Sequence, residues 1–127
     1  MIEEKEARKL AREWIEAWNE RDLERILSHY AEDVVFTSPF AIKLAESPNG
    51  TIKGKAALRD YFAKGLENFP KLHFELVEVL AGVASVTLYY KSVQNRLAAE
   101  VMELGPKGLV IRVMAHYTPG GAALAPR

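Results

Sequence analysis

The side chain best suited to chemistry is Glu100, a carboxyl group in a run of mostly apolar residues. Strand alternation over residues 97–104 puts Glu100 in phase with Ala98 and Met102, whereas Glu103 falls on the opposite face. A carboxyl on an apolar face has a raised pKa, because burial disfavours the charged form. We therefore predict that Glu100 is the catalytic residue, lining a pocket as a general acid or hydrogen-bond donor. Two alternatives stay open: a position at the wet mouth of the pocket, or an ion pair with an arginine.

Trp14 is the second candidate. It lies on an apolar stripe of a predicted helix, and its indole N–H needs a partner when it is buried. Two interpretations are open for it. The indole donates to a ligand oxygen across from Glu100, or Trp14 is a residue of the hydrophobic core.

Metal, thiol and phosphate chemistry find little support in the sequence. Because the chain has no cysteine, it has no disulfide, thiolate metal site or cysteine nucleophile. His29, His73 and His116 are too scattered for a metal signature. Gly54-Lys55 lacks the other residues of a phosphate-binding loop, and no Gly-x-Ser-x-Gly motif supports a serine triad. We expect no metal and no cofactor.

Composition narrows the class of protein. The chain has 127 residues, 49% of them hydrophobic, which is typical of one soluble domain. Lysine plus arginine and aspartate plus glutamate number 17 each, so no excess of positive charge favours nucleic acid. No signal-like start and no apolar run of about 20 residues is present, so we expect a cytoplasmic protein without a membrane segment. We predict one domain over residues 1–117 and a flexible tail over 118–127.

The first part of the chain predicts helices. Apolar residues at three- and four-residue steps from Ala7 to Trp18 indicate the first helix. Asp22 is a plausible N-cap for a second helix, whose buried stripe extends to Tyr30. A third helix is predicted over residues 55–69, where Pro70 ends it.

Less regular segments separate these helices. Residues 34–37 are β-branched or aromatic and predict a short strand. Residues 40–53 predict a loop with a short strand possible on either side, and the sequence leaves open whether this loop is a lid. Gly65 inside the third helix costs roughly 1 kcal/mol relative to alanine, which suggests a close backbone contact.

The second part of the chain predicts a sheet. Strands are expected over residues 72–80, 84–93, 97–104 and 109–117. Their short connections indicate hairpins and hence an antiparallel meander. Helices followed by consecutive strands predict an α+β fold, with the three helices on one face of a curved sheet.

Four segments of the chain form a recognisable pattern: Trp14-x3-Trp18-Asn19-x2-Asp22-Leu23-x2-Ile26-Leu27-x2-Tyr30-x2-Asp33-Val34-Val35-Phe36-x-Ser38-Pro39, Gly54-Lys55-x-Ala57-Leu58-x2-Tyr61-Phe62, Gly108-Leu109-Val110-Ile111 and Ala115-His116-Tyr117. This pattern resembles that of the SnoaL-like proteins of the nuclear transport factor 2-like superfamily. The resemblance implies a cone-shaped sheet wrapped around the helices, an apolar pocket inside the cone, and a homodimer formed through the outer sheet face.

The ketosteroid isomerases of this superfamily use an aspartate base, with a tyrosine and a protonated aspartic acid as oxyanion donors. The resemblance puts Trp14 at the tyrosine position, Ser38 at the base position and Glu100 at the position of the protonated acid. A serine without an activating partner cannot abstract a carbon-bound proton at neutral pH, so ketosteroid isomerisation is not expected. The Asp-Arg-Asp set of limonene epoxide hydrolase is not apparent either.

The family pattern and the phase of the strands also imply a set of ligand-binding residues. For the tyrosines, core packing is an equally open interpretation, and Ser38 is either a pocket residue or the turn residue before Pro39. Besides Trp14, the implied pocket residues are Tyr30, Ser38, Phe62, Leu88, Tyr90, Met102, Val113, Ala115 and Tyr117.

The leading hypothesis is a protein with a pocket for a small apolar molecule, acting as an acid–base isomerase, cyclase or hydratase of unknown substrate. The alternative is a non-catalytic binding module or a dimeric assembly module. A third possibility is an engineered or consensus scaffold of this fold.

Overall fold

The structure is a computed structural model that describes residues 1–119. Residues 120–127, which make up most of the predicted tail, lie outside the described residues. The elements are α1 (Glu4–Asn19), α2 (Leu23–Leu27), β1 (Tyr30–Thr37), α3 (Ala41–Leu44), β2 (Thr51–Lys53), α4 (Lys55–Asn68), β3 (Glu75–Ala81), β4 (Ser85–Lys91), a 3-10 turn η1 (Val93–Asn95), β5 (Leu97–Leu104) and β6 (Val110–Tyr117).

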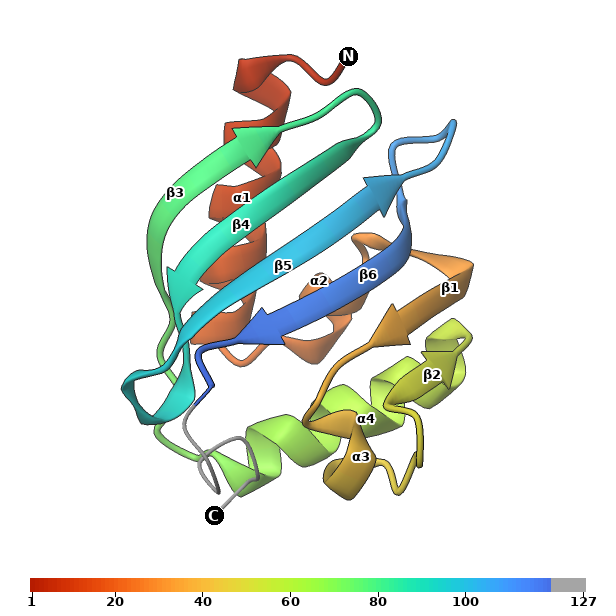
Figure 1. The fold of residues 1–127 in the computed structure, drawn as a ribbon, viewed down its shortest axis with the longest axis vertical. Helices are drawn as coiled ribbons and strands as arrows, with labels where there is room; N and C mark the ends of the chain where they lie inside the picture. Colours follow the sequence, from red (N-terminus) through yellow and green to blue (C-terminus); the bar gives the residue numbers. More distant parts are fainter. Residues whose placement is uncertain (120–127) are drawn as a thin grey trace.

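The strands form one curved sheet in the order β2-β1-β6-β5-β4-β3 (Figure 1). Helix α1 runs behind β3 and β4, and α4 crosses near β1 and β2, so the helices lie on one side of the sheet. The predicted α+β class is confirmed, and β3 to β6 form the predicted antiparallel meander. One pairing differs from an all-antiparallel sheet, because β1 runs parallel to β6.

The second helix is shorter than predicted and the first strand is longer. Helix α2 ends at Leu27, and Tyr30 already belongs to β1, where it pairs with Val110. The backbone N–H of Val110 donates to the carbonyl of His29 at 2.8 Å, so sheet pairing draws this segment out of the helix. The buried position of Tyr30 was therefore predicted correctly, but its element was wrong.

Two other predicted segments are corrected. The predicted loop over residues 40–53 contains a short helix, α3, and one short strand, β2, which pairs with β1. The strand predicted from residue 72 begins at Glu75.

The core lies between α1, α4 and the concave face of the sheet. Helix α1 buries Ala11, Trp14 and Trp18 on its predicted stripe. Helix α2 begins at the predicted cap, where the Asp22 carboxylate accepts a hydrogen bond from the Arg25 backbone N–H at 3.1 Å. Within residues 1–119, no helix is both long enough and apolar enough to cross a membrane.

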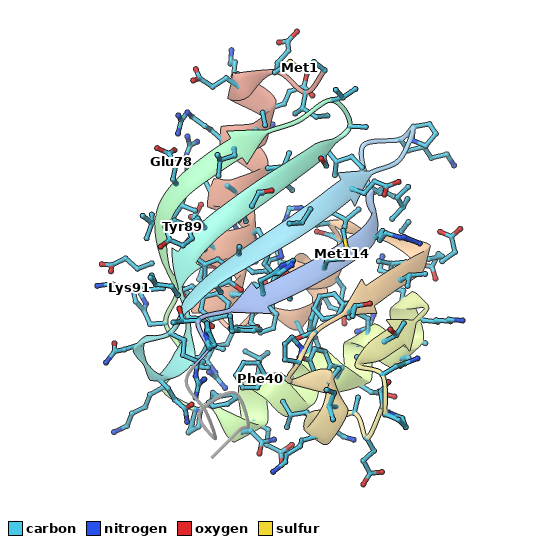
Figure 2. All side chains as sticks on the ribbon, in the orientation of Figure 1. Met1, Phe40, Glu78, Tyr89, Lys91 and Met114 are labelled. Carbon is cyan, nitrogen blue, oxygen red and sulfur yellow. The ribbon has the colours of Figure 1, made fainter. Side chains whose placement is uncertain are left out.

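The convex face of the sheet carries exposed side chains. Met114, which Figure 2 labels on β6, and Leu80 on β3 are among the exposed large hydrophobic residues. His116 is also exposed and alternates with the buried Ala115. Homodimer formation through this face stays a prediction.

Candidate functional site

A cavity of about 60 Å³ lies between the concave face of the sheet and helices α1 and α4. Its wall is mostly aromatic, and Glu100 is the only carboxyl group among the described residues that line it. The lining residues are Trp14, Trp18, Phe36, Phe40, Leu44, Tyr61, Phe62, Gly65, Phe69, Leu72, Phe74, Tyr90, Ser92, Val93, Glu100 and Tyr117.

Glu100 is held in the middle of the sheet. Its strand, β5, is paired on both sides, so that Glu100 lies opposite Leu88 on β4 and Ala115 on β6. The side chain is only 2% exposed, and it faces the cavity. Neither alternative left open by the sequence applies: Glu100 is not at a wet mouth, and it forms no ion pair with an arginine among residues 1–119.

The two carboxyl oxygens of Glu100 have different surroundings. The Tyr90 hydroxyl donates to Oε1 at 3.0 Å, whereas Oε2 has no hydrogen-bond partner among the described residues. Burial raises the pKa of Glu100 to about 7, and the hydrogen bond from Tyr90 lowers it by less. Near neutral pH both protonation states are therefore populated. Protonated Glu100 can donate from Oε2 to a ligand oxygen, and ionised Glu100 can accept a proton there.

Trp14 lines the cavity with its ring but not with its N–H group. The indole N–H donates to the Tyr30 hydroxyl at 2.8 Å, so its hydrogen bond is made within the protein. The ring stacks on Phe74 at a centroid distance of 5.7 Å and meets the edge of Tyr90 at 5.3 Å. The indole therefore supplies an apolar wall beside Glu100, and the predicted hydrogen bond from Trp14 to a ligand is not the arrangement observed.

Two further tyrosines, Tyr61 and Tyr117, line the cavity. The Tyr61 hydroxyl donates to Ser38 Oγ at 3.4 Å. Burial raises the pKa values of Tyr61 and Tyr117, so both remain protonated at neutral pH and can act as donors. Ser38 also accepts from the Phe40 backbone N–H at 3.3 Å, as a turn residue does. It is buried behind the wall and does not line the cavity.

The predicted pocket residues separate into two groups. Glu100, Trp14, Phe62, Tyr90 and Tyr117 line the cavity. The others are buried but do not line the cavity. This second group contains Tyr30, Ser38, Leu88, Met102, Val113 and Ala115.

Tyr61 was not predicted to be a pocket residue, and the role of Gly65 was predicted incorrectly. Tyr61 and Gly65 extend the apolar stripe of Leu58, Phe62 and Leu66 at three- and four-residue steps, which is a signal that the sequence does contain. The close backbone contact predicted at Gly65 is wrong, because a Cβ atom there would meet no atom within 4 Å outside the backbone of its own helix. Gly65 instead lines the cavity.

A wider hollow of about 410 Å³, which we call the vestibule, adjoins the cavity. Phe69, Leu72, Ser92 and Val93 line both spaces, so the vestibule lies between the end of α4 and the connection from β4 to β5. The vestibule is lined by Asn68, Phe69, Pro70, Lys71, Leu72, His73, Ser92, Val93, Gln94 and Asn95.

Metal binding gains no support from the geometry. In the part of the chain that the structure describes, no three histidine, aspartate or glutamate side chains are grouped so that they could hold a metal ion.

The chain is similar in sequence and in fold to known proteins. Residues 11–119 match the family described as SnoaL-like domain. The solved structure of a SnoaL-like protein of unknown function from Burkholderia thailandensis E264 is 42% identical, with a TM-score of 0.89, and the match covers 93% of this chain and 98% of that one. A search of curated proteins found no match.

Two more distant structures share the fold. A proposed ketosteroid isomerase from Kribbella flavida is 21% identical with a TM-score of 0.69, over 92% of this chain and 81% of that one. A nuclear transport factor 2-like protein of unknown function from Burkholderia xenovorans is 16% identical with a TM-score of 0.72, over 93% and 87% of the two chains.

Proposed function

We propose that this chain, which belongs to the SnoaL-like domain family, binds a small, largely apolar molecule in its cavity and uses Glu100 as an acid–base group. The reaction class is an isomerisation, a cyclisation or a hydration. The observation that carries the proposal is the unpartnered Oε2 atom of the buried Glu100, in a wall that is otherwise aromatic or apolar with a few hydroxyl groups. Perturbed carboxyls in apolar clefts are a mark of catalytic sites.

Glu100 suits a reaction in which one group both removes and returns a proton. In an isomerisation of a β,γ-unsaturated ketone, the ionised carboxylate takes a proton from the carbon between the carbonyl and the C=C bond, and the electron pair of that C–H bond moves into a dienolate. The protonated carboxyl then returns the proton to the γ carbon, which leaves the C=C bond conjugated with the carbonyl. A pKa of about 7 suits this exchange, because the ionised form that accepts the proton and the protonated form that returns it are both accessible near neutral pH.

The reaction also needs hydrogen-bond donors that stabilise the enolate oxygen. The hydroxyl groups of Tyr61 and Tyr117 are the candidates for these donors. Both residues line the cavity, and both stay protonated because burial raises their pKa values. Donors fixed in a site that excludes water stabilise developing negative charge more strongly than water does. We assign them this role in preference to Trp14, because the hydrogen bond from the Trp14 N–H group to Tyr30 is short, at 2.8 Å, whereas the bond from the Tyr61 hydroxyl to Ser38 is long, at 3.4 Å.

The size of the cavity bears on the ligand. At about 60 Å³ it is far smaller than the roughly 300–1,000 Å³ of common ligand pockets. A ligand therefore occupies the cavity together with the vestibule, or it displaces apolar side chains at their junction. Phe69 and Leu72, which line both spaces, are the side chains that must move in the second case.

The test is a thermal-shift screen against small ketones and phenols, followed by proton exchange. A ligand at about 100 times its dissociation constant adds roughly 2.7 kcal/mol, which raises the melting temperature by several degrees. A ketone that binds should then exchange the hydrogens next to its carbonyl for deuterium in heavy water, as followed by NMR.

Glu100→Gln should abolish this exchange, whereas Glu103→Gln, on the same strand but exposed, should leave it unchanged. Binding without exchange in the wild-type protein would favour the non-catalytic binding module. Equal exchange in Glu100→Gln and the wild-type protein would contradict the assigned role of Glu100.

A further inference from the structure

The buried guanidinium of Arg96 is the second unusual charged group of the concave face. Arg96 precedes β5 and has the same phase as Ala98 and Glu100, and only 6% of it is exposed. Its Nη2 atom donates to Gln94 Oε1 at 2.9 Å, but Nε and Nη1 have no partner among the described residues. No carboxylate of residues 1–119 forms an ion pair with it.

An arrangement of this kind is costly for folding. Arginine keeps its charge at all ordinary pH values, so burial cannot be relieved by loss of a proton. A buried charge with neither an opposite charge nor a full set of hydrogen bonds destabilises the folded state. Glu100 does not compensate it, because the two residues are four positions apart on an extended strand, which separates their Cα atoms by about 13 Å.

Arg96 lines neither the cavity nor the vestibule, but its backbone is hydrogen-bonded to Ser92 and Val93, which line both spaces. Its guanidinium carbon is 5.9 Å from the centroid of the Phe40 ring, and Phe40 lines the cavity. Its hydrogen-bond partner, Gln94, lines the vestibule. Arg96 is therefore next to residues of both spaces, four positions before Glu100 on the same face.

The vestibule has a matching charge. Among the described residues that line it, Lys71 carries a positive charge and none is acidic. A hollow lined by one sign of charge attracts ligands of the opposite sign. This observation is independent of the burial of Arg96, and it points to the same class of ligand.

We propose that Arg96 binds the carboxylate of an organic acid, and that the ligand of this site is an aromatic or alicyclic acid with an oxygen function at its far end. The carboxylate lies at the junction with the vestibule, the apolar ring lies against the aromatic wall, and the far oxygen reaches Glu100. Pairing with a carboxylate compensates the buried guanidinium, which is a residue well suited to this anion. The proposal rests on the proposed function for the position of the far oxygen.

The experiment uses three matched probes and the full-length chain. Para-hydroxycinnamate has both the carboxylate and the far oxygen, its methyl ester lacks the anion, and cinnamate lacks the far oxygen. Dissociation constants are measured by calorimetry at about pH 6, where Glu100 is mostly protonated. We expect the acid to bind about tenfold to a hundredfold more tightly than its ester, as for a hydrogen-bonded charged group.

Variants of Arg96 test whether this residue causes the preference for the acid over the ester. Arg96→Gln should remove the preference for the acid over the ester and leave the affinity for the ester unchanged, and Arg96→Lys should keep part of it. Arg112→Gln, which removes an exposed arginine from β6, is the matched control and should behave as the wild-type protein. Because the buried charge is uncompensated, Arg96→Gln should fold with a melting temperature no lower than that of the wild-type protein.

The outcomes separate this inference from the proposed function. Equal binding of acid and ester by the wild-type protein, or no binding of any probe at millimolar concentration, overturns the carboxylate site. An equal loss of affinity for acid and ester in Arg96→Gln shows a structural role and overturns it too. If the acid preference is lost in Arg96→Gln but Glu100→Gln binds hydroxycinnamate and cinnamate as the wild-type protein does, the carboxylate site stands and the role of Glu100 fails.

Discussion

Replacing Glu100 with glutamine should change how the stability of the protein depends on pH. The carboxyl is 2% exposed, and burial raises its pKa from 4.5 to about 7. A raised pKa means that the folded state holds the proton more tightly than the unfolded state does. The protonated carboxyl therefore contributes fully to stability below about pH 4.5, and this contribution is lost as the pH rises to about 7.

The size of the effect follows from the shift. A difference of about 2.5 pKa units at 1.36 kcal/mol each corresponds to roughly 3 kcal/mol. Glutamine has nearly the same shape, can still accept from the Tyr90 hydroxyl, and does not ionise. The free energy of unfolding of Glu100→Gln should therefore rise relative to the wild-type protein by about 3 kcal/mol between pH 4 and pH 8.

The assay is urea denaturation followed by circular dichroism at unit steps from pH 4 to pH 8. All other titrating groups are common to both proteins, so the difference between their two curves isolates Glu100. Glu103→Gln removes an exposed carboxyl from the same strand and should keep the wild-type profile. Parallel curves for Glu100→Gln and the wild-type protein, at every pH, would refute the reasoning.

Three further substitutions test the packing around the site, each by the free energy of unfolding in urea. Trp14→Phe should cost about 1–3 kcal/mol or more, because the buried Tyr30 hydroxyl loses its donor, and a Tyr30→Phe background should reduce that cost. Gly65→Ala should stabilise the protein by up to about 1 kcal/mol, since a Cβ atom meets no neighbouring element; a loss would show hidden crowding. Asp22→Ala should cost about 1 kcal/mol by removing the cap of α2, and an unchanged urea midpoint would contradict that role.

Local patterns were enough to predict most of the fold. The apolar stripe of α1, the cap at Asp22 and the meander of β3 to β6 depend on residues that are near one another in the sequence. The parallel pairing of β1 with β6 was not predicted, because it joins Tyr30 to Val110 across most of the chain. No turn or spacing rule reports such a contact, and the same pairing moved Tyr30 from the predicted helix into a strand.

The candidate site was predictable in part. Alternation along β5 correctly placed Glu100 on the buried face, because a strand has a strict period of two. The alternation shows which face of the sheet a residue is on, but not whether the residue reaches the cavity. Leu88 and Met102 therefore share the face of Glu100 without lining the cavity. Arg96 was missed because residues 94–96 were predicted to be a hairpin connection. Counting back from Glu100 in steps of two along the strand nevertheless reaches Arg96.

The most direct test of the Glu100 site is a carbon-13 NMR titration of the Glu100 side-chain carboxyl in the full-length protein, alone and with hydroxycinnamate bound. We expect a pKa of about 7 in the free protein and a change in that value when a ligand oxygen occupies the position next to Oε2. A pKa near 4.5 that the ligand does not alter would show that Glu100 is neither desolvated nor in contact with a bound molecule, and it would contradict the proposed site.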